Sequence, residues 1–305
     1  MTGDFVIFAG TANRELAASV ARELGVTIGA CVVEQFPDGE TSVRLDEPVR
    51  GREVFIIQPT APPVNEHLME LLAFADSCRR ASAAHITAII PYFGYARSDK
   101  RDRERVPVMA SVVADLMQRV GIHHVITVDM HTPQLEGFFR IPVDELAAVN
   151  VLAAALRNRL PEETIVVSPD VGRLPMATEF ARRLNTSVVV LEKKRESGTE
   201  TKVMHLVGDV RERHCLIIDD MISTGGTMRS GIEALLEAGA RPEITIAATH
   251  GLMLDGARDK LSHESVREVL VTDTVRVNDK DWPQLRVVSV APLIADAIRQ
   301  LKSGV

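Results

Sequence analysis

The chain has 305 residues, of which 46% are hydrophobic and 25% are charged, so it is long enough for two domains with substantial cores. Its formal net charge of -7 argues against a dedicated nucleic-acid surface. No apolar run approaches the roughly 18 residues that a membrane-spanning helix needs, and the N-terminus has no secretory signal pattern. The three cysteines have no metal-ligand spacing. We therefore expect a cytoplasmic protein with buried thiols and without nucleic-acid or membrane partners.

Short β-rich segments alternate with longer amphipathic segments along the whole chain, which is typical of parallel sheets with crossover helices. In the first half, the predicted strands are residues 5–8, 54–57, 85–90 and 124–129, and the predicted helices are residues 13–24, 64–81 and 107–120. In the second half, the predicted strands are residues 164–168, 187–191, 215–218, 243–248 and 267–272, and the predicted helices are residues 172–184 and 226–238. The fold class is therefore α/β, with a mainly parallel sheet flanked by helices in each of two domains.

The domain boundaries follow from this alternation. We place the N-terminal domain at residues 1–148 and the C-terminal domain at residues 149–286. The last apolar pattern, within residues 287–305, is expected to pack back on the first domain. No low-complexity linker separates the two halves.

The segment LIIDDMISTGGTMRS, residues 216–230, carries the most specific chemistry. Asp219 and Asp220 follow an apolar strand, at the end where open α/β sheets place their ligands. Paired carboxylates suit the vicinal hydroxyls of a ribose. The hydroxyl- and glycine-rich turn that follows can hold a phosphate with backbone N–H groups, hydroxyl groups and the start of a helix. An ordinary turn with an aspartate N-cap is the alternative, but a cap needs only one acceptor.

Two further segments suit a nucleotide. FPDGE, residues 36–40, is a turn in which an aromatic ring can stack on a base and acidic groups can accept from its amino group. PYFGYARSDKRDRER, residues 91–105, follows a buried strand and gathers five basic residues, which favours a polyphosphate. Solvated surface loops are the alternative explanation of both segments.

Two other strand ends carry candidate ligands and cations. His131 in VDMHT and Asp170 in SPD can hold a divalent ion, because magnesium needs few protein ligands when phosphate oxygens complete its shell. Lys193, Lys194 and Arg195 leave a strand and enter a polar stretch, where cations can neutralise a transferring phosphoryl group. The alternative for His131 is a histidine whose ring only makes hydrogen bonds within the protein. The alternative for the three cations is a solvated surface loop. The chain has neither a GxxxxGK[ST] loop nor the kinase signatures, so ATP chemistry requires a different phosphate cradle.

The chain resembles the ribose-phosphate pyrophosphokinase family, also called phosphoribosyl pyrophosphate synthase. The resemblance rests on seven motifs that occur in this order: FPDGE, PYFGYARSDK, VDMHTPQLEGFF, SPDVG, LEKKR, VGDV and DDMISTGGT. The resemblance implies two phosphoribosyltransferase-like α/β domains, a magnesium requirement, and a homo-oligomer that is a hexamer built from dimers. It also implies transfer of the diphosphoryl group of ATP to the anomeric hydroxyl of ribose 5-phosphate, with AMP as the second product. DDMISTGGT alone is shared with phosphoribosyltransferases, whereas the ordered set is specific.

The resemblance also assigns roles to individual residues. Lys193 and Arg195 would be catalytic, and His131 and Asp170 would hold magnesium. The ATP-binding residues would be Phe36, Asp38, Gly39, Glu40, Arg97 and Ser98, with the turn at 36–40 serving a neighbouring subunit. The residues that bind ribose 5-phosphate would be Arg195, Asp219, Asp220, Ser223, Thr224, Gly225, Gly226 and Thr227.

Three positions depart from the family pattern. Ser98 stands where the family has an amide, and Ser223 stands where the phosphate loop begins with aspartate. Arg173 replaces a second glycine in SPD-x-GG, which puts the local backbone geometry in question. Two alternatives to an active synthase therefore remain: a non-catalytic regulatory subunit, and a phosphoribosyltransferase or a module that senses phosphoribosyl pyrophosphate. The last leaves FPDGE and residues 91–105 without a role.

Overall fold

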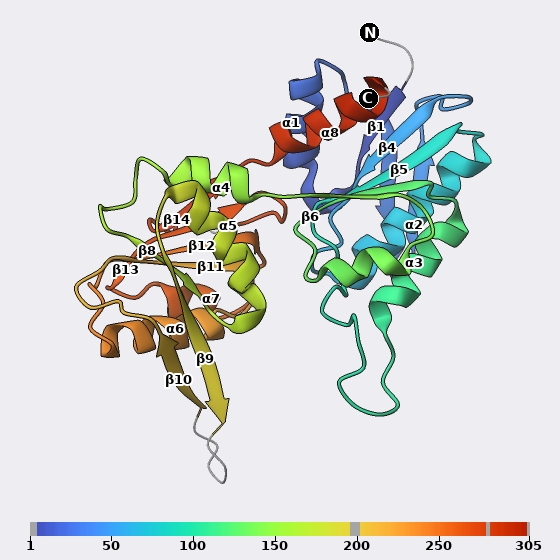
Figure 1. Cartoon of the computed structure of the whole chain (residues 1–305). Coiled ribbons are helices and arrows are strands. Elements are labelled where there is room, and N and C mark those ends of the chain that lie inside the picture. The colour runs from blue at the N-terminus through green and yellow to red at the C-terminus, as the bar shows by residue number, and fades with distance from the viewer. Residues whose placement is uncertain (1–4, 196–201, 279–280, 304–305) are drawn as a thin grey trace. The chain divides into compact units, whose positions relative to one another are not determined.

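A computed structural model describes residues 5–195, 202–278 and 281–303. The chain divides into two compact units, Met1–Ala147 with Val290–Val305, and Ala148–Ser289. Each unit contains one main sheet with helices packed on it (Figure 1). Among the described residues, no helix combines the length and the apolar character needed to cross a membrane.

The first unit contains a five-stranded parallel sheet in the order β1-β4-β5-β6-β7. The strands are β1 (Phe5–Ala9), β4 (Glu53–Ile57), β5 (His85–Ile90), β6 (His124–Val128) and β7 (Val143–Leu146). The helices are α1 (Arg14–Leu24), α2 (Val64–Arg80), α3 (Met109–Val120) and α8 (Ala291–Ser303), with short 3-10 helices η1 (Thr11–Asn13) and η2 (Pro133–Phe138). Helices α1 and α8 lie together, although they come from opposite ends of the sequence (Figure 1).

The core of the first unit follows from the alternation of side chains along each strand. Val6 and Phe8 of β1 and Val54 and Ile56 of β4 point to the same face of the sheet. There they pack against buried residues of α2 and α3, among which Phe74 has no exposed surface. The parallel strands are apolar on both faces because helices cover both faces.

A small antiparallel hairpin projects from this unit and was not among the predicted strands. It consists of β2 (Cys31–Gln35) and β3 (Thr41–Leu45), which pair with each other and not with the main sheet. The hairpin packs on α2, where the Ser77 hydroxyl donates to the Val43 carbonyl at 3.3 Å.

The second unit contains a seven-stranded sheet in the order β10-β9-β8-β11-β12-β13-β14, in which only the β10–β9 pair is antiparallel. The strands are β8 (Ile165–Ser168), β9 (Val188–Arg195), β10 (Lys202–Val207), β11 (Cys215–Ile222), β12 (Ile244–Gly251), β13 (Val266–Thr272) and β14 (Leu285–Val288). The helices are α4 (Val149–Leu156), η3 (Val171–Arg173), α5 (Leu174–Leu184), α6 (Gly226–Glu237) and α7 (Ala257–Leu261).

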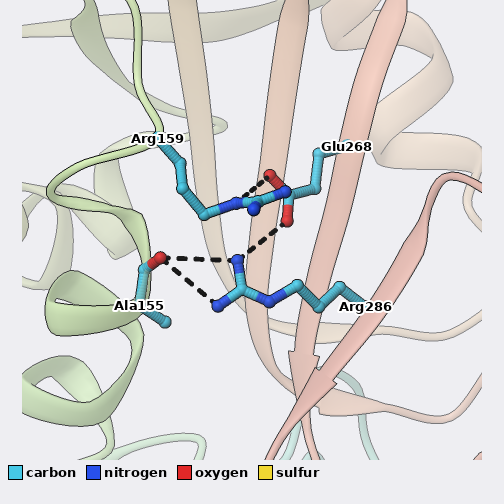
Figure 2. A network of polar contacts seen from close by, with 4 residues as sticks. All are labelled: Ala155, Arg159, Glu268 and Arg286. Atoms are coloured by element: carbon cyan, nitrogen blue, oxygen red, sulfur yellow. Dashed lines mark hydrogen bonds and ion pairs between the residues drawn. The ribbon is translucent and has the colours of Figure 1, made fainter.

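A buried carboxylate connects the segment around α4, at the start of this unit, to the sheet through hydrogen bonds and ion pairs (Figure 2). Glu268 of β13 accepts from Arg159 at 3.3 Å and from Arg286 of β14 at 3.2 Å, and Arg286 also donates to the Ala155 carbonyl of α4 at 3.4 Å. Only 9% of the Glu268 side chain is exposed, so its charge requires these partners.

The predicted α/β class is confirmed, with a parallel sheet in one unit and a mixed sheet in the other. The structure places the return to the first unit at Val290, because residues 287 and 288 belong to β14 of the second sheet. The cysteines are all free thiols. Cys78 and Cys215 are buried, and burial raises the pKa of each thiol to about 12, whereas Cys31 on the hairpin is only half-buried.

Candidate functional site

The carboxylate pair lies inside β11, which continues to Ile222 and so beyond the predicted end of this strand. β8 pairs only with residues 215 to 217 of β11, whereas β12 pairs with β11 as far as Ile222. Among the described residues, the second half of β11 therefore has no strand on the β8 side. Both Asp219 and Asp220 fall in this half, and 13% and 4% of their side chains are exposed.

The segment after β8 brings a cation to this pair. The Arg173 guanidinium lies 3.4 Å from a carboxylate oxygen of Asp219 and 3.4 Å from one of Asp220. Its backbone φ of -93° and ψ of -1° are helical values that any residue adopts, so the arginine that replaces glycine here causes no backbone strain.

Burial dominates the electrostatics of the pair. Burial first and the neighbouring Asp220 carboxyl second raise the pKa of Asp219 to about 8, although the Arg173 guanidinium opposes the rise. The Asp220 backbone N–H donates to Asp219 Oδ1 at 2.8 Å. The pair can therefore accept hydrogen bonds from neutral hydroxyl groups while a cation compensates its charge.

The glycine-rich turn follows the pair directly. Gly225 is the N-cap of α6 and has a positive φ of 72°, which glycine adopts at no steric cost. A Cβ atom there would lie 3.3 Å from the Ala257 carbonyl oxygen. Because Gly225 offers no side chain to cap α6, the backbone N–H groups of the first helical turn remain suited to an anion. Ser223, Thr227 and Gly226 are half-buried beside it, and Thr224 is exposed.

Lys260 is a neighbour of this turn that the sequence motifs did not indicate. Its ammonium group donates to the Thr224 carbonyl at 2.8 Å, from a position 36 residues further along the chain. Lys260 lies in the short helix α7. Just before this helix, the Leu254 N–H donates to the Ser223 carbonyl at 3.0 Å. Lys260 thus adds positive charge beside the predicted phosphate loop. No local motif around Lys260 could have revealed this contact.

Asp170 begins the η3 turn as its N-cap. Its Oδ1 accepts from the Arg173 N–H at 3.0 Å, and its backbone carbonyl accepts from the Ser168 hydroxyl at 2.7 Å. The carboxylate is half-buried at the carboxyl end of β8, the kind of position predicted for it.

The predicted catalytic cations lie in a hairpin instead of a loop. β9 continues to Arg195 and pairs with β10, so Lys193 lies opposite Met204 and Arg195 lies opposite Lys202. The strand was predicted to end at residue 191, and the pairing with β10 extends it. The side chains of Lys193, Lys194 and Arg195 lie outside the described residues.

In the first unit, the FPDGE turn forms the tip of the β2–β3 hairpin. The Phe36 N–H donates to the Glu40 carbonyl, and Gly39, with a φ of 94°, donates back to the Phe36 carbonyl, both at 2.8 Å. Asp38 accepts from the Glu40 N–H at 3.1 Å. The Phe36 side chain is 48% exposed, which is unusual for a phenylalanine and suits a ring that stacks on a ligand.

The segment from 91 to 105 borders a cavity of about 930 Å³. Three cations, Arg97, Lys100 and Arg103, line this cavity together with the rings of Tyr92 and Tyr95. Its other lining residues are Pro63, Val64, Asn65, Glu66, Ala96, Ser98, Asp102, Val106 and Pro107. The combination of cations and aromatic rings suits a phosphorylated aromatic ligand.

Ser98 has a structural partner at the edge of this cavity. Its hydroxyl oxygen accepts from the Met109 N–H at 3.2 Å, and its carbonyl accepts from the Ala110 N–H at 3.2 Å, so Ser98 satisfies the start of α3. The serine side chain, which is shorter than the family's amide, thus accepts a hydrogen bond from the start of α3.

His131 is half-buried and follows β6 in the same unit. Its neighbour Thr132 donates to Asp99 at 2.8 Å, which joins the His131 segment to the segment that carries Arg97. Asp170, by contrast, belongs to the second unit. Three of the predicted nucleotide and metal residues, Arg97, Ser98 and His131, therefore lie on connected segments of the first unit.

The side chains present fit a magnesium ion only if substrate oxygens complete its shell. No three His, Cys, Asp or Glu side chains form a metal-binding group in the described part of the chain. His131 in the first unit and Asp170 in the second each offer a single ligand, which is too few for a magnesium ion with its octahedral shell rich in oxygen. A metal carried by phosphate oxygens suits either ligand.

The second unit thus combines a carboxylate pair, a glycine-rich turn and a helix start, as a sugar-phosphate-binding domain does, and sequence comparison assigns the same class. The phosphoribosyl transferase domain matches residues 143–283, and the N-terminal domain of ribose phosphate pyrophosphokinase matches residues 5–121. The chain belongs to the ribose-phosphate pyrophosphokinase family, whose members are enzymes.

Full-length relatives support this assignment. The ribose-phosphate pyrophosphokinases of Caldanaerobacter subterraneus and Thermotoga maritima are each 43% identical, and each comparison covers 99% of this chain and 96% of the relative. The crystal structure of phosphoribosylpyrophosphate synthetase from Mycobacterium smegmatis is 40% identical and superposes with a TM-score of 0.94, covering 99% of this chain and all of that one. The family predicted from the motifs is therefore confirmed.

Proposed function

We propose that this protein transfers the diphosphoryl group of ATP to the anomeric hydroxyl of ribose 5-phosphate. The anomeric oxygen forms a bond to the β-phosphorus, and the bond from that phosphorus to the oxygen shared with the α-phosphate breaks. The hydroxyl proton passes to solvent, and the products are 5-phosphoribosyl 1-diphosphate and AMP. The observation that carries the proposal is the carboxylate pair directly before the glycine-rich start of α6, in a chain of this family.

The sugar phosphate is assigned to the second unit. Asp219 and Asp220 accept from the ribose hydroxyls, and Ser223, Thr224, Gly225, Gly226 and Thr227 hold the 5-phosphate. The positive φ of Gly225 and the Lys260 contact to Thr224 support this assignment, because both shape a turn that is rich in donors and positive charge. Arg195 is proposed to contact the same substrate.

ATP is assigned to two features of the first unit. Phe36, Asp38, Gly39 and Glu40 receive the adenine, and the exposed ring of Phe36 supports this role. Arg97 and Ser98 contact the nucleotide from the lining of the 930 Å³ cavity. Since the Ser98 hydroxyl already accepts from α3, we assign the electrostatic part of this contact to Arg97.

Catalysis is assigned to positioning and charge neutralisation, because the chain offers no obvious covalent nucleophile. Lys193 and Arg195 neutralise charge on the transferring group. His131 and Asp170 are each proposed as magnesium ligands, and a bound magnesium ion would supply charge neutralisation on the phosphates. A homo-oligomer, a hexamer built from dimers, is the proposed assembly.

Incubation of the purified protein with ATP, magnesium and ribose 5-phosphate tests the activity. We expect AMP to form only when both substrates and the metal are present. Absence of AMP at every concentration of added inorganic phosphate would favour the alternative, a regulatory subunit without catalysis. Release of AMP without ribose 5-phosphate would indicate hydrolysis, which the proposal does not include.

A further inference from the structure

Arg173 makes a contact in the sugar site that the motifs did not predict. Its guanidinium uses Nε toward Asp219 Oδ1 and Nη2 toward Asp220 Oδ2, each at 3.4 Å. One guanidinium edge therefore faces both carboxylates, and 17% of the Arg173 side chain is exposed. Its side chain reaches the part of β11 that lies beyond the pairing with β8, which ends at Ile217.

The position of Arg173 is fixed by its own backbone. Its N–H donates to Asp170 Oδ1 at 3.0 Å and to the Asp170 carbonyl at 3.3 Å, which closes the η3 turn. The residue then starts α5, whose proline at the first turn requires no N–H partner. The short η3 turn thus fixes the backbone position from which the guanidinium reaches the pair.

The charge of the pair explains why a cation matters here. Two adjacent carboxylates that are almost fully buried repel each other and favour the uptake of a proton. Each hydroxyl of a vicinal diol needs an acceptor oxygen, and a carboxyl group offers one in either protonation state only if it is oriented toward the diol. A guanidinium beside both groups lowers the cost of keeping both ionised.

We propose that Arg173 is a positioning residue for the sugar, which orients the carboxyl oxygens of Asp219 and Asp220 as acceptors for two neighbouring hydroxyl groups. The inference rests on the proposed assignment of this pair to ribose 5-phosphate. It gives Arg173 a role that a glycine at this position cannot perform. It also predicts that the positive charge matters more than the shape of the arginine side chain.

Isothermal titration calorimetry with ribose 5-phosphate, without ATP, tests this role in three variants of the full chain. Arg173→Gln removes the charge, and Arg173→Lys retains it. Arg182→Gln is the matched control, because Arg182 is an exposed arginine of α5 that pairs only locally with Glu179. We expect Arg173→Gln to weaken binding about tenfold, as for the loss of about one charged hydrogen bond. Arg173→Lys should recover most of the affinity, and Arg182→Gln should match the unsubstituted protein.

A further measurement separates positioning from a purely structural role. The dissociation constant for ATP should be the same in Arg173→Gln and in the unsubstituted protein, because the change acts only on the sugar site. Unfolding curves show that each variant is folded before it is titrated. A parallel loss of affinity for both ligands would overturn the inference in favour of a general loss of structure.

Two outcomes separate this inference from the proposed function. If the unsubstituted protein binds ribose 5-phosphate and Arg173→Gln binds it equally well or more tightly, Arg173 does not support the acceptors, and only this inference fails. If the unsubstituted protein binds no ribose 5-phosphate, the assignment of the pair to that sugar fails, and the inference fails with it.

Discussion

Asp219 is a buried carboxylate whose neighbours act on its pKa in opposite directions. Burial and Asp220 raise the pKa from 3.8 to about 8, against the effect of Arg173. Between these two values the folded protein keeps a proton that the unfolded chain has released. By linkage, the free energy of unfolding must fall as pH rises through this window.

Asp219→Asn should remove this dependence, because an amide does not titrate. We expect the variant to gain stability relative to the unsubstituted protein as pH rises from about 4 to about 8, which urea unfolding at several pH values measures. Asp209→Asn is the control. The Arg211 guanidinium lowers the pKa of Asp209 to about 2, so this substitution should add no trend in the same window. A constant difference for Asp219→Asn would contradict the raised pKa.

Lys193 tests the proposed neutralisation of charge in the transition state. Lys193→Ala should lower kcat by about 10²- to 10³-fold, the usual effect of removing a group that stabilises developing charge, and leave ATP affinity nearly unchanged. Steady-state kinetics and ATP titration measure the two quantities. Lys302→Ala, which removes a lysine paired with Glu53, should change neither. A loss confined to KM would rule out this role.

At the scale of single residues, the motifs indicated candidate side chains but not the partners that these side chains contact. The motifs indicated Asp219, Asp220 and the glycine turn because these residues are contiguous. The contacts of Arg173 and Lys260 depend on segments that the fold brings together across long sequence separations. Ser98 could not be interpreted from its identity alone, because its hydroxyl serves the start of α3.

Among the elements, α6 shows how a backbone conformation can create an anion site. Gly225 combines a positive φ with a close backbone neighbour, the Ala257 carbonyl. Gly51 also has a positive φ, of 70°, but a Cβ atom there would meet nothing within 4 Å. A substitution at Gly51 therefore tests the left-handed conformation alone, whereas one at Gly225 tests this conformation together with a steric contact.

Gly225→Ala should destabilise the fold by about 1–2 kcal/mol through the left-handed conformation, and should also weaken ribose 5-phosphate binding because the turn must shift away from Ala257. Gly51→Ala should show a similar loss of stability without the loss of binding. Chemical denaturation and calorimetry measure the two effects. Equal sugar affinity in both variants would separate the Gly225 turn from the phosphate site.

The strongly apolar strands and the amphipathic helices were predictable from their periodicity, and β1, β4, β5, β6, β8 and β13 lie where the pattern placed them. The β2–β3 hairpin was missed because its strands are only partly buried and neither carries the continuous apolar run that marks the strands of the main sheet. β9 was predicted too short, because its charged end has no apolar pattern in the sequence although it pairs with β10.

For the whole molecule, the exposed turn at 36–40 provides a test of the assembly. If Phe36 serves the nucleotide of a neighbouring subunit, a hybrid of Phe36→Ala and Asp220→Asn subunits contains some sites with both native residues. Co-expression of the two variants with different tags should then restore activity well above that of either variant alone. Asp219→Asn mixed with Asp220→Asn is the control, because both changes affect the same pair, and it should restore nothing. A lack of restoration in the first hybrid would place Phe36 in its own subunit's site.

The return of the C-terminal helix to the first unit was visible in the apolar pattern of the last residues. Its starting point was less predictable, because β14 is a short strand that continues the second sheet immediately before the chain crosses over. Hydrophobic periodicity does not distinguish which sheet receives such a segment.

The central claim concerns which bond of ATP breaks, and phosphorus NMR of the reaction mixture tests it most directly. With ATP, magnesium and ribose 5-phosphate, the β- and γ-phosphorus signals should move together into a diphosphate on the anomeric oxygen, with an equal amount of AMP. The appearance of ADP or orthophosphate in place of these products would contradict the account.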